Sequence, residues 1–117
     1  MKAFLCYTRC STCRKAKQWL IDNGVGFSER SIVEQNPTAE ELTKWIKTSG
    51  LPVSRFFNTS GILYRAENVK DKVRILPDDE LTDLLASNGM LVKRPLLVSD
   101  DVVLVGFNEK TWTEKLL

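Results

Sequence analysis

The chain contains no histidine among its 117 residues. This absence excludes Cys–His nucleophile pairs, histidine general bases and histidine metal ligands, so backbone N–H groups, arginine or lysine must activate any reactive thiol. The sequence also lacks an apolar run near the ~20 residues that cross a bilayer and the N-terminal pattern of a secretory signal. We therefore expect a cytoplasmic protein that does not enter a membrane.

A strong net charge is missing as well. The formal charge is +2 at pH 7, and 43% hydrophobic with 27% charged residues is typical of a globular protein. So small a charge argues against nucleic-acid binding, which means that any anion site must be local. The length suits one compact domain spanning residues 1–117, which we expect to be a monomer.

Cysteine is scarce and confined to one stretch. The three thiols are Cys6, Cys10 and Cys13, and an odd number so close together does not form the disulfide framework of a secreted protein. Cys10 and Cys13 form a Cys-x-x-Cys motif directly before residues with helical spacing. The N–H groups and dipole at a helix start lower the pKa of a thiol and make it nucleophilic. The motif therefore predicts a thiol redox site.

The first part of the chain is predicted to be a β-α-β unit. Residues 2–7 are apolar and strand-like, residues 14–20 have helical spacing that ends at Asn23-Gly24, and residues 26–33 can form a second strand. A crossover helix between two strands makes the strands parallel.

Helices are predicted for the middle of the chain. Thr38 and Glu41 form a capping box for a helix that Gly50 ends, and a further helix starts at residues 77–80 and closes at residues 87–89. Between residues 51 and 72 the pattern is mixed, which indicates short helical pieces without readable boundaries.

The C-terminal part predicts a β-hairpin and a last helix. Residues 94–98 and 102–106 are β-branched and apolar, a turn at residues 99–101 separates them, and Asn108 can cap the helix that follows. The order β-α-β, helices, β-β-α is that of an α/β protein with a thioredoxin-like fold, a mixed sheet and a helical insert.

This fold gives the two cysteines of the motif different roles. We expect Cys10 to lie exposed at the start of the first helix and to attack, and Cys13 to lie one turn in, less exposed, and to resolve the product as a disulfide. A pKa moved from ~8.5 to ~6 raises the thiolate fraction at pH 7 from about 3% to about 90%. Arg9, Arg14 and Lys15 add positive charge, which acts weakly through water.

Two kinds of metal site are alternatives to a redox pair. Cys-x-x-Cys can be half of a zinc site, but without histidine the chain offers three sulfurs where zinc takes four ligands. The spacing Cys6-x3-Cys10-x2-Cys13 also suits an iron–sulfur cluster. We expect no metal, and we expect Cys6, inside the first strand beside Phe4 and Leu5, to be a small buried hydrophobe.

Arg94-Pro95 precedes the predicted hairpin. In a thioredoxin-like fold the proline at this point is commonly cis and lies beside the nucleophile, so Pro95 is a candidate cis-proline. Arg94 would then present its planar guanidinium to an oxyanion, or to the thiolate, next to Cys10. The alternative is a surface arginine before a strand.

Three segments of the sequence form a recognisable set, namely YTRCSTCRKA at residues 7–16, FFNTSG at residues 56–61 and GMLVKRPL at residues 89–96. Together they resemble the arsenate reductase-like (ArsC/Spx) family, and the Spx/MgsR-like branch most. The resemblance spans essentially the whole chain and implies a thioredoxin-like fold with a helical insert.

The resemblance implies two kinds of activity. Arsenate reductases of the family use one cysteine at the position of Cys10 and three arginines, of which this chain keeps Arg94, with Asn58 and Asn108-Glu109-Lys110 at the other two positions. The Spx branch keeps Cys-x-x-Cys as a disulfide switch and binds the RNA polymerase α subunit. Pro52 stands about where that branch has a glycine needed for this contact.

We therefore predict a thiol–disulfide redox protein that acts as a reductase, with Cys10 as nucleophile, Cys13 as resolving thiol and Arg94 as anion-binding residue. It needs no bound cofactor and takes electrons from an external thiol such as glutathione, glutaredoxin or thioredoxin. The alternative is an Spx-like redox-sensing transcriptional regulator that binds the C-terminal domain of the RNA polymerase α subunit. Neither activity requires direct contact with nucleic acid.

Overall fold

The computed structural model describes residues 2–117. Four strands form one mixed sheet in the order β2-β1-β3-β4, with the bounds β1 Lys2–Cys6, β2 Phe27–Ser31, β3 Leu96–Val98 and β4 Val103–Val105. Strand β1 pairs in parallel with β2 and antiparallel with β3, and β3 pairs antiparallel with β4. The predicted parallel β-α-β unit and the C-terminal hairpin are both confirmed.

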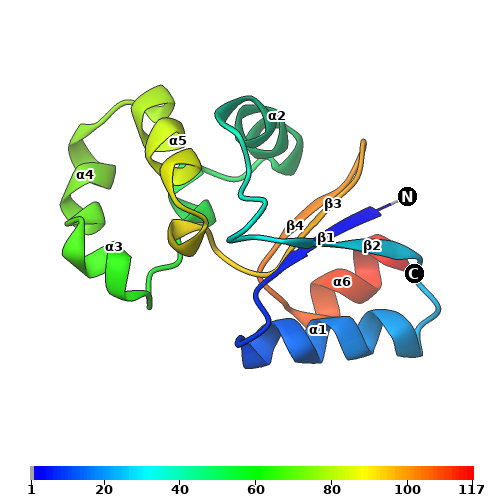
Figure 1. Ribbon diagram of the computed structural model, residues 1–117. Coiled ribbons are helices and arrows are strands. Elements are labelled where there is room, and N and C mark those ends of the chain that lie inside the picture. The colour runs from blue at the N-terminus through cyan, green and yellow to red at the C-terminus, as the bar shows by residue number, and fades with distance from the viewer. Residues whose placement is uncertain (1) are drawn as a thin grey trace.

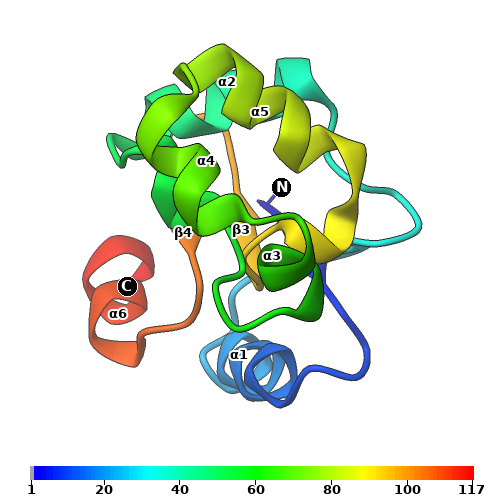
Figure 2. The same ribbon diagram turned by 90° about the vertical axis from the view of Figure 1, so that its left-hand side faces the viewer.

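The helices complete a thioredoxin-like fold with a helical insert between its β-α-β and β-β-α parts. Their bounds are α1 Ser11–Asp22, α2 Ala39–Ser49, η1 Val53–Phe56, α3 Ile62–Ala66, α4 Val69–Ile75, α5 Asp78–Ser87, η2 Gly89–Leu91 and α6 Glu109–Leu116. Helices α1 and α6 cover one face of the sheet and α2 lies on the other, while α3, α4 and α5 project beyond one end of the sheet (Figure 1). Figure 2 shows the same end turned toward the viewer, where α1 lies below the insert.

The side chains of β1 divide the core between the two faces of the sheet. Phe4 packs with Trp19, Leu20 and Trp112 on the side of α1 and α6. Its neighbour Leu5 belongs to the larger cluster formed with α2, α5 and η1, because successive side chains of a strand point to opposite faces. Both faces of the central strand are therefore buried, which fixes its end and the start of α1 beside it.

Local signals explain where the helices begin and end. The side chain of Thr38 accepts a hydrogen bond from the N–H of Glu41, whose carboxylate accepts one from the N–H of Thr38, so the predicted capping box is confirmed. Gly50 ends α2 at φ +71°, a left-handed conformation that favours glycine. The side-chain oxygen of Asn108 accepts a hydrogen bond from the N–H of Thr111, so Asn108 caps the start of α6, as predicted.

The C-terminal strands are shorter than predicted. The sequence pattern predicts strands at residues 94–98 and 102–106, whereas β3 and β4 hold three residues each. The chain leaves the ladder at Arg94–Pro95, and a proline cannot donate a ladder hydrogen bond. Within residues 2–117, no helix has the length and apolar character needed to cross a membrane.

Candidate functional site

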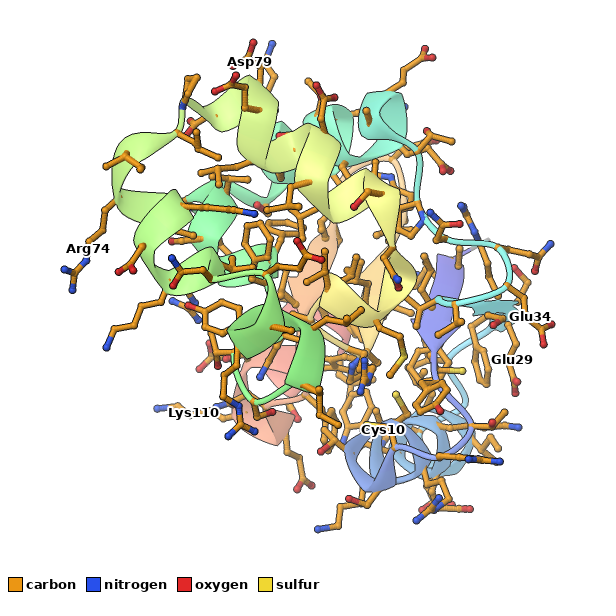
Figure 3. All side chains as sticks on the ribbon, turned by 60° about the vertical axis from the view of Figure 1, so that its left-hand side comes forward. Cys10, Glu29, Glu34, Arg74, Asp79 and Lys110 are labelled. Carbon is orange, nitrogen blue, oxygen red and sulfur yellow. The ribbon has the colours of Figure 1, made fainter. Side chains whose placement is uncertain are left out.

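Cys10 directly precedes helix α1. A tight turn follows β1, in which the Cys10 N–H donates to the carbonyl of Tyr7 at 3.0 Å, and the Cys10 carbonyl accepts the first helical hydrogen bond from Arg14 at 3.2 Å. The residue has extended backbone angles and is the N-cap of α1. Figure 3 shows Cys10 at this end of the helix. The turn thus places a thiol where the free N–H groups of the first helical turn point.

The surroundings of Cys10 lower its pKa from the ordinary 9.0. Partial burial alone raises the pKa, but this effect is outweighed by the backbone N–H groups of Cys13 and Thr12, the S–H of Cys13 and the guanidinium of Arg94, which all stabilise the thiolate. The predicted contribution of the helix start is therefore present. The main groups that lower the pKa are donors at the sulfur rather than surface charges farther out.

The surroundings of Cys13 have the opposite effect and raise the pKa of its thiol. Its side chain is 3% exposed, and its sulfur accepts the Tyr7 N–H at 3.3 Å. Burial, with smaller contributions from the hydrogen bond to Cys10 and from the charges of Cys10 and Cys6, raises the pKa of Cys13 to about 12. The thiol of Cys13 is thus protonated at neutral pH and can donate to the Cys10 thiolate.

The prediction that Cys6 is a buried hydrophobe is wrong. Cys6 is partly exposed and lines two surface cavities, because it is the last residue of β1, where the sheet ends and the gap between β2 and α1 opens to solvent. Burial and the charge of Glu29 raise the pKa of its thiol. All three cysteines are free thiols in this structure.

Arg94 and Pro95 reach the site from the other end of the sequence. The Arg94–Pro95 peptide bond, a candidate for cis geometry in a thioredoxin-like fold, is cis. The guanidinium carbon of Arg94 lies 5.0 Å from the centroid of the Tyr7 ring. Its Nη1 atom is buried without a hydrogen-bond partner among the described residues. The guanidinium of Arg94 is positively charged and has an N–H group without a partner, so it can donate hydrogen bonds to a bound anion.

Asn58, where the resemblance places an arginine in arsenate reductases, is a structural residue of a turn. It is buried, its N–H donates to the Leu91 carbonyl at 2.8 Å, and its carbonyl accepts the N–H of Gly61 at 3.2 Å. Its side-chain oxygen accepts the Ser60 hydroxyl at 3.2 Å. Asn58 therefore holds the segment after η1 in place and offers no charge to an oxyanion.

Tyr7 is the residue at this site that the sequence did not reveal. Its backbone contacts both cysteines of the motif, and its ring faces the guanidinium of Arg94. The contact with Arg94 joins residues from opposite ends of the chain, so no local pattern could have indicated it. Within the described part of the chain, no three His, Cys, Asp or Glu side chains are arranged to hold a metal ion.

Comparisons with known proteins give relatives along almost the whole chain. The protein YusI from Bacillus subtilis (strain 168) is 48% identical over 111 residues, which cover 95% of this chain and 94% of that protein. A global transcriptional regulator Spx from Staphylococcus epidermidis (strain ATCC 35984) is 30% identical over 100 residues, covering 86% of this chain and 75% of the regulator.

Solved structures agree with this result. The crystal structure of an ArsC family related protein from Bacteroides fragilis has a TM-score of 0.94 at 50% identity, over 97% of this chain and 95% of that one. An arsenate reductase from Vibrio cholerae has a TM-score of 0.86 at 25% identity, over 98% and 97% of the two chains. The model of the ArsC family matches residues 5–115, and the chain belongs to the ArsC family.

Proposed function

We propose that this protein is a thiol–disulfide reductase in which Cys10 is the nucleophile, Cys13 the resolving thiol and Arg94 the anion-binding residue. The single observation that supports this most is the contrast within the motif. Helix N–H groups, a neighbouring S–H and a guanidinium all favour a thiolate at Cys10, while burial keeps Cys13 protonated. A reactive thiol beside a protected one is what two-step disulfide exchange requires.

The reaction proceeds through a mixed disulfide. The Cys10 thiolate attacks one sulfur of a substrate disulfide, the substrate S–S bond breaks, and one half leaves as a thiolate. Cys13 then loses its proton and attacks the Cys10 sulfur, which releases the second half of the substrate and forms the Cys10–Cys13 disulfide. Two external thiols, from glutathione, glutaredoxin or thioredoxin, return the pair to its reduced form and are themselves oxidised to a disulfide.

The first step prepares Cys13 for the second. The negative charge of Cys10 and its hydrogen bond with Cys13 both raise the pKa of Cys13, in addition to burial. Both effects disappear once Cys10 is in a mixed disulfide, because its sulfur is then neutral. The pKa of Cys13 falls at the stage when it must lose its proton, while the Tyr7 N–H continues to stabilise the developing thiolate.

Arg94 favours substrates with negative charge near the reacting sulfur. Among residues 2–117 its buried Nη1 has no hydrogen-bond partner, and an anion bound at the guanidinium would satisfy this donor. Glutathione-type disulfides carry carboxylates and fit this requirement. Arsenate, which the related reductases of the family hold with three arginines, would meet one arginine here, so we expect little arsenate reduction.

Replacement of each cysteine by serine tests the proposal. The assay uses thioredoxin as the electron donor, because glutathione would only regenerate the substrate. Cys10→Ser should then abolish reduction of glutathione disulfide, whereas Cys13→Ser should stop after the first step and accumulate a Cys10–glutathione adduct visible by mass spectrometry. Equal loss of turnover without any adduct in Cys13→Ser would contradict the assigned order. Full activity of Cys10→Ser would contradict the proposal as a whole.

A redox-sensing regulator is the second candidate function, supported by the relationship to Spx. In this case the Cys10–Cys13 disulfide would alter a protein-binding surface without turnover, and the partner would be the C-terminal domain of the RNA polymerase α subunit. A pull-down with that domain, in fully reduced and fully oxidised protein, separates the candidates. Binding in one redox state would favour the regulator, and absence of binding in both would remove it.

A further inference from the structure

Cys6 and Cys13 line the same surface cavity beside β1 and α1. Along β1 the side chains alternate, so Cys6 lies on the same face as Phe4 and packs against the cluster formed with α1 and α6. Cys13 is buried on α1. Both residues line one surface cavity of about 150 Å³, together with Tyr7, Arg14 and Lys17.

A hydrogen bond limits how far apart the two residues can be. The Cys13 sulfur lies 3.3 Å from the backbone nitrogen of Tyr7. That nitrogen is two covalent bonds, about 2.4 Å, from the Cα of Cys6, so the Cys13 sulfur lies within about 6 Å of this Cα. The Cys6 sulfur is two bonds from the same Cα, so rotation about the Cα–Cβ bond can turn it toward the Cys13 sulfur. A bond between Cys6 and Cys13 thus requires side-chain rotation rather than refolding.

We propose that Cys6 is a third redox thiol of this protein, which displaces Cys10 from the Cys10–Cys13 disulfide to form a Cys6–Cys13 disulfide. The proposed Cys6–Cys13 bond is argued from this geometry alone, whereas the displacement rests on the proposed function. The displacement involves no net oxidation. The Cys6 thiol releases its proton to solvent and attacks the Cys13 sulfur, the Cys10–Cys13 bond breaks, and Cys10 leaves as a thiolate.

The direction of the exchange follows from the environments of the sulfurs. Cys10 is the better leaving group, because its thiolate is stabilised by N–H donors and by Arg94 and a thiol with a lower pKa leaves faster. Burial and the charge of Glu29 raise the pKa of the Cys6 thiol, and Lys17 offsets them only in part. A thiol with a higher pKa replaces one with a lower pKa in a disulfide, which favours release of Cys10. The exchange returns Cys10 to its reactive form while the protein still carries one disulfide.

The positions of lysine and arginine allow a direct test by peptide mapping. Trypsin cleaves after Lys2, Arg9 and Arg14, so Cys6 falls on the peptide of residues 3–9 while Cys10 and Cys13 share the peptide of residues 10–14. The full chain is oxidised with diamide, which takes two electrons and two protons from a pair of thiols. It is then quenched in acid, alkylated with N-ethylmaleimide while unfolding, and digested.

The Cys10→Ser variant tests the bond independently of Cys10 chemistry. We expect its peptides 3–9 and 10–14 to be joined by a disulfide within a monomer that has lost two hydrogen atoms. The matched Cys6→Ser/Cys10→Ser variant should retain a free Cys13 or form intermolecular dimers. If oxidised Cys10→Ser keeps free Cys6 and Cys13, or forms only dimers, the proposed bond does not exist.

Wild-type protein tests the displacement. We expect the two peptides to be joined and Cys10 to carry the alkyl group. A disulfide confined to the peptide of residues 10–14, with Cys6 alkylated, would overturn the displacement. Near-ultraviolet circular dichroism of the variants, which retain all three tryptophans, verifies that they are folded. Failure of the proposed function itself would appear differently, as an unreactive Cys10 in reduced wild-type protein.

Discussion

Two thiols three positions apart in this chain have opposite environments. Cys10 is at the free end of α1, where backbone N–H groups and a guanidinium lower its pKa, and Cys13 is enclosed by the sheet, where burial raises its pKa to about 12. The difference arises because one helical turn carries the chain from the N-cap to a position facing the sheet. Each thiol also affects the other, since the S–H of Cys13 is one of the donors to Cys10.

The donor role of Cys13 predicts different effects of two substitutions. Cys13→Ala removes the donor and should raise the pKa of Cys10, because the thiolate loses a hydrogen bond that stabilises its charge. Cys13→Ser keeps an O–H donor and should raise it less. The measurement is a pH titration of thiolate ultraviolet absorbance in a Cys6→Ser background. Identical titration curves for the alanine and serine variants would show that the side chain at this position does not donate.

Arg94 is expected to act on both the nucleophile and the substrate. Arg94→Met should raise the pKa of Cys10 and slow reduction of glutathione disulfide about ten-fold or more, because two favourable interactions with negative charge are lost. Reduction of the uncharged hydroxyethyl disulfide should fall less, and Arg94→Lys should recover part of the loss. Equal slowing of both substrates would mean that Arg94 acts on the thiolate alone.

At the scale of elements, a bidentate ion pair joins β2 to α2. Arg30 donates to both carboxylate oxygens of Glu41 at 2.7 and 2.8 Å, and this pairing, against partial burial and with help from the Thr38 N–H, lowers the pKa of Glu41 from 4.5 to about 2. The stabilisation is therefore complete above about pH 4.5 and is lost as the pH falls toward 2. The Glu41 side chain is 34% exposed, so screening reduces the contribution to about 1–2 kcal/mol.

Glu41→Gln should remove this dependence on pH. We expect its free energy of unfolding to be about 1–2 kcal/mol below that of wild type at pH 7, with the gap closing between pH 4.5 and 2. Urea denaturation at several pH values provides the measurement. Glu40→Gln, at the exposed neighbouring position in the first turn of α2, is the control and should follow the wild-type pH curve. A constant gap across this pH range would exclude titration of Glu41 as its cause.

Gly89 permits a close approach between η2 and the segment after β2. A Cβ atom at this position would overlap the carbonyl oxygen of Ile32, a backbone atom that cannot move aside alone. Gly89→Ala should therefore destabilise the protein by about 2–3 kcal/mol or prevent folding. Gly26→Ala, where a Cβ meets nothing within 4 Å, should change stability by less than about 1 kcal/mol. Similar urea midpoints for the two variants would contradict the close approach.

The elements that local signals specify were predictable, and those held by distant contacts were not. The capping box of α2 depends on residues three positions apart, and the β-α-β unit can be recognised from the consecutive patterns of its strands and helix. Residues 53–75 instead form three short helices, with Asn68 at φ +53° between α3 and α4, and are tied to the rest of the molecule by the bridge between Phe57 and Val92. Such pairings join residues far apart in sequence, so no local pattern indicates their boundaries.

The same distinction holds for the site. The placement of Cys10 at a helix start could be predicted from the Cys-x-x-Cys motif and the residues after it, whereas the contact of Arg94 with Tyr7 depends on how the two ends of the chain meet. The partial exposure of Cys6 depends on where β2 ends beside it. Strand alternation gives the face on which a side chain lies, but not whether solvent reaches it.

For the molecule as a whole, one apolar cluster packs against each face of the sheet. Together they hold the end of β1 and the start of α1, where the site lies. On the side of α1, the rings of Trp19 and Trp112 lie 6.0 Å apart edge to face, and Phe107 lies 4.9 Å from Trp112. This cluster fixes the axis of α1 and hence the direction of its N–H groups toward Cys10. The small net charge leaves Arg94 as a local source of anion recognition.

The rate of iodoacetamide labelling of Cys10 as a function of pH tests this arrangement most directly. Tryptic peptides separate Cys10 and Cys13 from Cys6, and fragmentation separates the first two. We expect the labelling of Cys10 to reach half its maximal rate below pH 9.0, with Cys13 unlabelled until far higher pH. A midpoint for Cys10 at or above pH 9.0, or faster labelling of Cys13, would show that the start of α1 does not hold a reactive thiolate.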